Sequence, residues 1–482
     1  MGFIQKTFSA RQFPFIVLTA ATMVWLLCIN LFQDGMFIDG IQYAAVARNL
    51  ARGVGTFWNP VLAQNSVAGL NSFHEHPPLV FFIQSLFFRF FGFNNIYPER
   101  IYCLFTFLLT ALFIALIWRK LFKAQATQQL WWLPVLLWTI MPIVFWAYTN
   151  DIQENTMGVF TTAAVYFFLC AIGSGSALRS VSFYVGSISV LLAGFCKGVP
   201  GLFPVGFFFI YCLSVRKINF SRAVVYTFGA VAIITIIVWL VLQNNAANQA
   251  LQTWFFGRML KRISDDPTEN SHFYILTGLF TEQLPPLILT ALALLIYKTK
   301  KASNQINKGY FILFLLLGFA GSLPLMLTLV QRNFYFIPAL PMFAIAWALL
   351  IADGLNNAFN QLNQQHKLKN GITIFAGLAL IAGIVTAIVF AGKIKRDKEM
   401  LHDVYTIQKL VPRNSFISVT PDVMWRDWSF RCYMMRYDEI SFSDKDTCQY
   451  YIAKPNQPVS DKFTPTDAPL HQYRLYKIKD SK

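Results

Sequence analysis

Long apolar runs separated by short polar segments make up most of residues 13–392. A helix needs about 20 residues to cross the hydrocarbon core of a bilayer, so runs of this length predict membrane-spanning helices. The pattern predicts eleven such helices, at 13–32, 99–119, 129–147, 155–173, 180–196, 199–214, 221–242, 284–297, 309–330, 335–352 and 371–392. The expected fold class is therefore an all-α polytopic membrane protein with about 11–13 transmembrane helices and additional juxtamembrane helices.

A further apolar run at 78–93 decides the topology. Basic residues cluster in four later segments, at 118–123, 214–222, 297–308 and 366–370. If residues 78–93 do not cross, all four segments fall on the same side as Lys6 and Arg11, which the positive-inside rule makes cytoplasmic. Arg89 in the middle of the run also favours a helix lying in the membrane interface. A short true span is the alternative.

This topology puts most of the unusual polar residues outside the cytoplasm. The outer segments are the first loop 33–98, the corner 148–154, the hairpin at Lys197, the loop 243–283, the corner 331–334 and the residues after 393. Composition becomes polar after Gly392, so we expect a transmembrane domain over 1–392 and a small α/β domain over 393–482. The apolar run at 13–32 is too long for a cleavable signal peptide and predicts an uncleaved first helix.

Composition supports the membrane interpretation. The 482 residues are 56% hydrophobic and only 13% charged, whereas about a quarter of a typical soluble domain is charged. The formal charge of +17 does not indicate nucleic-acid binding, because the basic residues lie in short segments between apolar runs. Among the seven cysteines, only Cys432 and Cys448 lie in a polar region, where they could form a disulfide outside the cytoplasm.

Acidic side chains gather in two of the outer segments. The first loop contains Asp34 and Tyr43, which are candidates for binding substrate, and Asp39. Asp39 could cap the helical pattern that ends at Gly53 or act as a general base. At the corner, Asp151 and Glu154 precede and begin the next apolar run, where acids complement the helix dipole. Two acids exceed what capping alone requires.

Cations and aromatic residues gather in the remaining outer segments. Lys197 stands alone between two apolar runs, either as a snorkelling anchor or as the partner of an anion. The other candidates for binding substrate in these segments are Arg258, Arg262, His272, Tyr274, Arg332 and Tyr335. Several cations facing outer acids indicate a site that binds phosphate.

The stretch SFHEHPPLVFF, residues 72–82, places Glu75 between two histidines, His74 and His76. Adjacent residues of a regular helix or strand cannot converge on one metal ion, so a metal triplet is disfavoured. Glu75 and His272 are the side chains that would serve as ligands if a divalent metal binds. No cofactor is required by the pattern.

Five motifs in order give the chain a resemblance to a known superfamily. They are DGIQYAAVARNLARGVGTFWNP, FHEHPPLVFFIQSLFFRFFG, ENTMGVF, KGVPGLFP and RNFYFIPALP, within residues 30–350. In these the chain resembles membrane glycosyltransferases with the GT-C fold, the aminoarabinose (lipid A) transferase and protein O-mannosyltransferase superfamily. The resemblance implies transfer of a hexosyl or pentosyl group, with inversion, from a polyprenyl-phosphate donor to a lipid, glycan or protein acceptor. It also implies a bacterial inner membrane protein with an active site on the periplasmic face. In such a membrane, the basic segments put the N-terminus in the cytoplasm and the C-terminal domain in the periplasm.

The resemblance assigns roles to the candidate residues. Asp39 is the expected base, Glu75, Glu154 and Asp151 shape the catalytic site, and the cations bind the donor phosphate. Two departures stand out: Gly40 replaces the second acid of the first motif, and His76 replaces a lysine, which makes phosphate binding depend on pH. A transporter or lipid flippase is the rival function, but transporters place ionisable groups near the midplane and contain internal repeats.

Overall fold

The computed structural model describes residues 12–64, 72–261, 267–299 and 306–479. The chain forms two compact units. The first, here called the helical unit, comprises Met1–Ile29, Leu104–Thr149 and Gln153–Val389. The second, the mixed unit, comprises Asn30–Cys103, Asn150–Ile152 and Phe390–Lys482, so it joins the first loop to the C-terminal segment.

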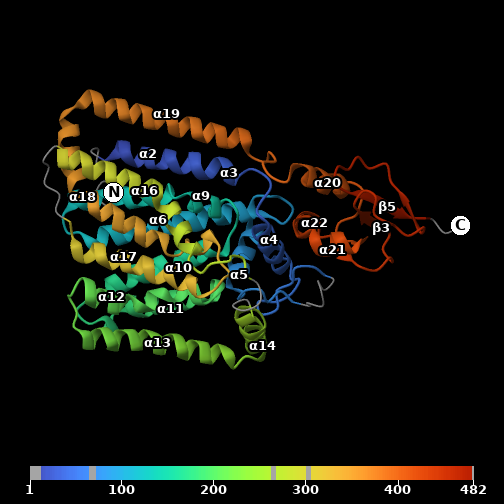
Figure 1. Ribbon diagram of the computed structural model, residues 1–482, viewed down its shortest axis with the longest axis horizontal. Coiled ribbons are helices and arrows are strands. Elements are labelled where there is room, and N and C mark those ends of the chain that lie inside the picture. Colours follow the sequence, from blue (N-terminus) through green and yellow to red (C-terminus); the bar gives the residue numbers. More distant parts are fainter. Residues whose placement is uncertain (1–11, 65–71, 262–266, 300–305, 480–482) are drawn as a thin grey trace. The chain divides into compact units, whose positions relative to one another are not determined.

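Helices account for nearly all of the helical unit, and Figure 1 shows the long ones lying side by side. Its α-helices are α2 (Phe13–Met23), α7 (Gln125–Gln128), α8 (Trp132–Thr139), α9 (Pro142–Tyr148), α10 (Gln153–Ile172), α11 (Val181–Lys197), α12 (Phe207–Ser214), α13 (Phe220–Leu242), α14 (Asn245–Trp254), α16 (Tyr274–Thr299), α17 (Lys308–Ser322), α18 (Leu340–Gln364) and α19 (His366–Phe390). Helices α3 (Ile29–Leu31) and α6 (Pro98–Leu121) include residues of both units, as does α19 through its last residue, Phe390.

Short 3₁₀ and π segments connect or extend these helices. They are η1 (Val24–Cys28), η2 (Gln129–Trp131), η3 (Ala177–Arg179), η4 (Val199–Gly206), η5 (Phe255–Met259), η6 (Leu323–Leu327) and η7 (Asn333–Phe336). Of them, η1 and η5 are π-helical.

Each of the eleven predicted spans coincides with an apolar helix. Among the described residues, eight helices are long and apolar enough to cross a membrane, and the bent pair Gln125–Thr139 and Pro142–Tyr148 makes nine if it is one span. The remaining two, Val181–Lys197 and Val199–Ser214, are shorter apolar helices. The chain is a multi-pass membrane protein, as the apolar pattern predicts.

The helix at 78–93 is α5 (Leu79–Phe91) in the mixed unit. Its 13 residues rise about 20 Å, which is less than the roughly 30 Å of the hydrocarbon core. One face buries Phe81, Gln84 and Phe88, while Phe90 on another face is 83% exposed. These features agree with a helix lying in the membrane interface.

The C-terminal segment forms the predicted small α/β domain. A five-stranded sheet has the order β2-β1-β3-β5-β4, with β1 parallel to β2 and β3, and β5 antiparallel to β3 and β4. The strands are β1 (Phe416–Val419), β2 (Ser441–Ser443), β3 (Tyr450–Ala453), β4 (Phe463–Pro465) and β5 (Arg474–Ile478). The helices are α20 (Lys398–Gln408), α21 (Pro421–Arg426) and α22 (Trp428–Asp438). Cys432 and Cys448 are free thiols, so the disulfide considered from the sequence is not formed.

The core of the mixed unit includes residues from both ends of the chain. Helix α4 (Ile38–Ala51) packs against α22, and Figure 1 shows the two helices side by side. Met36 and Ile41 belong to the same buried cluster as Ile417, Phe430 and Met434. Burial of this shared apolar surface stabilises the first loop and the C-terminal domain together. No local sequence pattern indicates this association.

Candidate active site

The candidate residues are distributed over both units. Asp34, Asp39, Tyr43, Glu75, His76 and Asp151 lie in the mixed unit. Glu154, Lys197, Arg258, His272, Tyr274, Arg332 and Tyr335 lie in the helical unit. Arg262 lies outside the described residues.

Asp39 occupies the first turn of α4 and is partly exposed. The prediction that Asp39 caps this helix is wrong, because the N-cap residue is Phe37 and α4 begins at Ile38. The Asn150 side chain instead accepts the Phe37 N–H at 2.9 Å. A carboxylate at the second helical position still benefits from the helix dipole. Asp39 thus lies in the first turn of α4 without acting as its N-cap.

Glycine at position 40 allows the start of α4 to approach the Asn150 backbone. A Cβ atom at Gly40 would lie 2.0 Å from the Asn150 carbonyl oxygen. A second acidic side chain cannot fit there, which gives a physical reason for the departure at Gly40.

The Asp34 carboxylate is buried and has four polar partners. One oxygen accepts the Gly35 N–H at 2.7 Å and the Tyr437 hydroxyl at 2.6 Å, and lies 3.4 Å from the Arg100 guanidinium. The other oxygen accepts the Tyr405 hydroxyl. Burial and the Asp34 charge raise the pKa of Tyr437 well above its usual value. With its oxygens occupied in this way, Asp34 is suited to positioning the loop.

His76 is buried and its imidazole Nε2 lies 3.0 Å from the Tyr43 hydroxyl. The two rings meet edge to face, with centroids 5.5 Å apart. His74 is engaged separately: its Nε2 lies 3.0 Å from the Trp58 carbonyl oxygen, and its Nδ1 lies 3.2 Å from the Ser72 hydroxyl. The two histidines flanking Glu75 therefore have different partners, while Glu75 itself is partly exposed.

Asp151 is 3% exposed and adopts a left-handed backbone conformation with φ +52°. Its carboxyl oxygens accept hydrogen bonds from the Gln84 amide and, at 3.3 Å, from the Cys103 thiol. Burial raises the pKa of Asp151 well above its usual value, although the Gln84 hydrogen bond acts in the opposite direction. Both carboxyl oxygens of Asp151 are thus engaged by donors from the mixed unit.

In the helical unit, Glu154 and Lys197 form a buried ion pair. The Lys197 ammonium lies 2.8 Å from a Glu154 carboxylate oxygen, and the Lys197 and Glu154 side chains are 11% and 3% exposed. Glu154 stands in the first turn of α10, and Lys197 is the last residue of α11. The ends of two adjacent helices thus bring together the acid and the cation predicted at the corner and the hairpin.

Aromatic rings enclose the Lys197 ammonium. The ammonium lies 5.3 Å from the centroid of the Phe334 ring and 5.2 Å from that of Tyr335, within cation–π range. Gly198 follows with φ +93°, and a Cβ atom there would lie 2.7 Å from the Trp254 ring. Glycine is needed at this position for both its backbone conformation and the close approach of Trp254.

Glu282 was not identified from the sequence, yet it supports these rings. Its carboxylate accepts the Ile143 N–H at 2.7 Å and the Asn333 amide at 3.1 Å. Asn333 begins η7, which carries Phe334 and Tyr335, and Phe334 stacks on Trp146 of α9. An acid inside an apolar helix is itself a functional signal. That signal was missed because the predicted span began at residue 284, whereas α16 begins at Tyr274.

The other cations and aromatic residues are more exposed. Arg258 in η5 is partly exposed, while Tyr274, at the start of α16, and Arg332, before η7, are exposed. His272 is also exposed, and its Nδ1 lies 2.6 Å from the Met326 carbonyl oxygen. The described residues contain no cluster of three or more His, Cys, Asp or Glu side chains suited to a metal ion.

A buried charged network in the mixed unit was also missed. Glu99 lies 2.7 Å from Arg436 and 3.2 Å from Arg100, while Arg48 lies 3.8 Å from Glu439. At the end of α22, Asp438 is fully buried, and neither of its carboxyl oxygens has a hydrogen-bond partner in the part of the chain that the structure describes. Burial raises the pKa of Asp438 to about 7.

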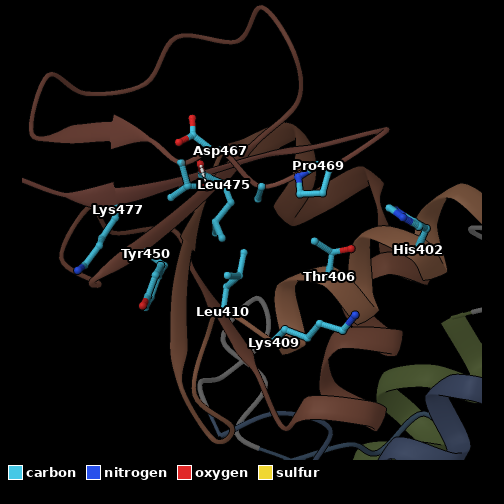
Figure 2. A pocket seen from close by; sticks show the side chains of 11 residues that line it. His402, Thr406, Lys409, Leu410, Tyr450, Asp467, Pro469, Leu475 and Lys477 are labelled. Atoms are coloured by element: carbon cyan, nitrogen blue, oxygen red, sulfur yellow. Dashed lines mark hydrogen bonds between the residues drawn. The ribbon is translucent and has the colours of Figure 1, made fainter.

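A hollow of about 630 Å³ lies in the C-terminal domain, between the end of α20, the sheet and the loop before β5 (Figure 2). Figure 2 shows Leu410 at its centre, with Lys477 and Tyr450 on one side and His402 and Lys409 on the other. None of the candidate residues predicted from the sequence lines this hollow.

Comparisons with known proteins agree with the fold. Residues 75–242 match the family model described as Dolichyl-phosphate-mannose-protein mannosyltransferase. No curated protein matches the chain in sequence. The crystal structure of ArnT from Cupriavidus metallidurans bound to undecaprenyl phosphate is similar, with a TM-score of 0.68 and 12% identity over 98% of this chain and 99% of that chain. The apo structure of the same ArnT has a TM-score of 0.66 and 13% identity over 96% and 97% of the two chains.

At this level of identity, the likeness to ArnT establishes the fold. It extends over almost the whole of both chains, including the C-terminal ninety residues, which the motifs did not cover. The fold expected from the five motifs is confirmed. The chain is a multi-pass membrane protein with the GT-C glycosyltransferase fold.

Proposed function

We propose that this protein is a membrane glycosyltransferase that transfers a sugar from a polyprenyl-phosphate donor to a lipid, glycan or protein acceptor. The observation that carries the proposal is the ArnT fold over nearly the whole chain, together with the mannosyltransferase family match over residues 75–242. The similar ArnT structure contains undecaprenyl phosphate, which supports a polyprenyl phosphate as the carrier. By the basic-segment topology, we place the reaction on the periplasmic face of a bacterial inner membrane.

In the proposed reaction, Asp39 removes the proton from the acceptor hydroxyl. The hydroxyl oxygen attacks the anomeric carbon, and the bond from that carbon to the donor phosphate oxygen breaks with inversion. The polyprenyl phosphate leaves with the bonding electrons, and cationic side chains stabilise its charge. The cations assigned to this role are Lys197, Arg258, Arg262 and Arg332.

The remaining candidates receive supporting roles. We assign His76, whose imidazole contacts Tyr43, to donation to a phosphate oxygen, and Tyr274, Tyr335 and His272 to contact with the donor. Glu75 and Glu154 shape the site. Asp34 and Asp151 position the first loop, because their buried oxygens already accept hydrogen bonds. A divalent metal held by Glu75 and His272 would assist departure of the phosphate, although the chemistry does not require it.

The test is sugar transfer by the purified protein in lipid nanodiscs, with a panel of synthetic polyprenyl-phosphate sugars and total bacterial membrane lipid or protein as acceptor. We expect transfer from at least one donor, and Asp39→Asn should lower kcat by about 100-fold or more because a general base contributes this much. Asp461→Asn, an exposed acid of the C-terminal domain, is the matched control. No transfer from any donor, or an Asp39→Asn variant as active as the parent, contradicts the proposal.

A further inference from the structure

The backbone leading into α4 is held by groups from three distant parts of the chain. The Asp34 N–H donates to the Lys393 carbonyl at 2.9 Å, and the Gly35 N–H donates to the Asp34 side chain. The Met36 N–H donates to the Tyr433 hydroxyl at 2.9 Å, and the Phe37 N–H donates to the Asn150 side chain. Every backbone N–H from residue 34 to 37 therefore donates a hydrogen bond. Asp39 follows two residues later.

Tyr433 is the central contact in this arrangement. Its hydroxyl accepts the Met36 N–H and lies 3.0 Å from the Met36 carbonyl oxygen and 2.9 Å from an Asp397 carboxylate oxygen. The side chain is completely buried. A buried hydroxyl is costly unless it is hydrogen-bonded, and this one is satisfied both as donor and as acceptor.

Tyr437, one turn later on α22, repeats the pattern. Residues four apart lie on the same helix face, and the rings of Tyr433 and Tyr437 are 5.7 Å apart. Tyr437 donates to the Asp34 carboxylate at 2.6 Å, while Tyr405 of α20 stacks on Tyr437 and donates to the other oxygen. Two tyrosines of one helix thus hold residues 34 and 36 of the first loop.

Burial alone does not account for the two hydroxyl groups. Met36 and Ile41 already pack with Phe430 and Met434 in the apolar core, and phenylalanine at position 433 would fill almost the same space. The Tyr433 hydroxyl additionally fixes the orientation of the Met36 backbone through directional hydrogen bonds. It thereby fixes the path of the chain into α4.

We propose that the C-terminal domain supports the catalytic base, with Tyr433 as a positioning residue that acts on Asp39 through Met36. The inference rests on the proposed function, in which Asp39 is the base. Tyr433 does not touch the reacting atoms. Its loss affects the orientation of the Asp39 carboxylate and leaves the donor-binding cations unchanged.

The kinetic test uses Tyr433→Phe in nanodiscs, with Tyr476→Phe on β5 as the matched control. We expect kcat to fall about 10- to 100-fold because small misplacements of a catalytic group have effects of this size, with donor KM within about twofold of the parent. In an Asp39→Asn background, Tyr433→Phe should give no further loss, because its effect passes through Asp39. An unchanged kcat, or an equal loss in the Asp39→Asn background, overturns the proposal.

A second measurement is independent of activity. Hydrogen exchange of peptides covering residues 32–40 should be faster in Tyr433→Phe than in the parent and in Tyr476→Phe, with exchange in α10 and α11 unchanged. If the parent transfers no sugar but exchange at 32–40 rises selectively, the proposed function fails and the support of the loop by Tyr433 stands. If exchange at 32–40 is unchanged, Tyr433 does not hold the loop and the inference fails.

Discussion

The Lys197 ammonium lies 2.8 Å from the Glu154 carboxylate, and both side chains are almost completely buried. Glu154→Gln removes this counter-charge, and breaking a buried pair from one side costs about 3–5 kcal/mol. We expect a clearly lower unfolding temperature in detergent. The double variant Glu154→Gln with Lys197→Met should recover part of the loss, because no cation is then stranded. If the stability loss of the double variant equals the sum of the losses of the two single variants, Glu154 and Lys197 are not coupled.

Replacing Lys197 alone tests its assigned role in phosphate binding. Lys197→Met should raise the donor KM about tenfold or more, since a charge-assisted contact with phosphate contributes roughly 1.5–3 kcal/mol. Lys217 is a suitable control, because its ammonium also lies over an aromatic ring, 5.5 Å from the centroid of Tyr310, but in a predicted cytoplasmic segment. Equal effects of Lys197→Met and Lys217→Met on donor KM would remove Lys197 from the donor site.

Gly198 should not tolerate a side chain. In Gly198→Ala the positive-φ backbone conformation costs about 1–3 kcal/mol, and overlap of the new methyl group with Trp254 adds about 1–3 kcal/mol. The unfolding temperature in detergent should fall accordingly. Adding Trp254→Leu should recover the overlap contribution but not the backbone contribution. Complete recovery of the parent's unfolding temperature would show that the backbone conformation at residue 198 does not affect stability.

Glu282 can be tested by exchanging donor and acceptor. Glu282→Leu leaves the Ile143 N–H and the Asn333 amide without an acceptor, at about 1–3 kcal/mol for each buried group. In the double variant Glu282→Gln with Asn333→Asp, the new amide oxygen at position 282 can still accept from Ile143, while the amide N–H donates to the new carboxylate at position 333. We expect this double variant to unfold closer to the parent than Glu282→Leu does. A double variant less stable than Glu282→Leu would contradict the proposed geometry.

Asp438 should make stability depend on pH. Its pKa rises from 3.8 to about 7 on burial, so between these values the folded chain binds more protons than the unfolded chain. The free energy of unfolding therefore falls as pH rises from about 4 to about 7 and then levels off, with a total change of up to about 4 kcal/mol from this group. Asp438→Asn should remove this component and be more stable than the parent at pH values above about 7. If the free energy of unfolding depends on pH in the same way in the parent and in Asp438→Asn, this prediction is contradicted.

The membrane-spanning helices could be predicted from the sequence, but the packing of the loops could not. Apolar runs are local signals, so all eleven predicted spans coincide with helices. The contact between Met36 and Tyr433 joins residues 397 positions apart, and no local pattern identifies such a partner. Glu282 was missed because polar neighbours made the helix seem to begin later than it does.

Among the candidate residues, the sequence was most informative where chemistry is concentrated in short motifs. Glu154 and Lys197 were predicted on separate segments, and the ends of α10 and α11 bring them together. Asp34 and Asp151 were equally conspicuous in the sequence, but whether a carboxylate faces substrate or buried donors depends on tertiary neighbours such as Tyr437 and Gln84. Charge alone could not distinguish these two situations.

The pairing of Asp34 with residues 393 and 395 has a consequence for how the protein is made. During synthesis, residues 34–37 are made well before residues 393–437, which hold them. Until the final ninety residues have been synthesised, the membrane helices can insert while the loop still lacks its partners. A chain that stops short of residues 393–438 would therefore be inserted in the bilayer, but its first loop would lack these hydrogen-bond partners.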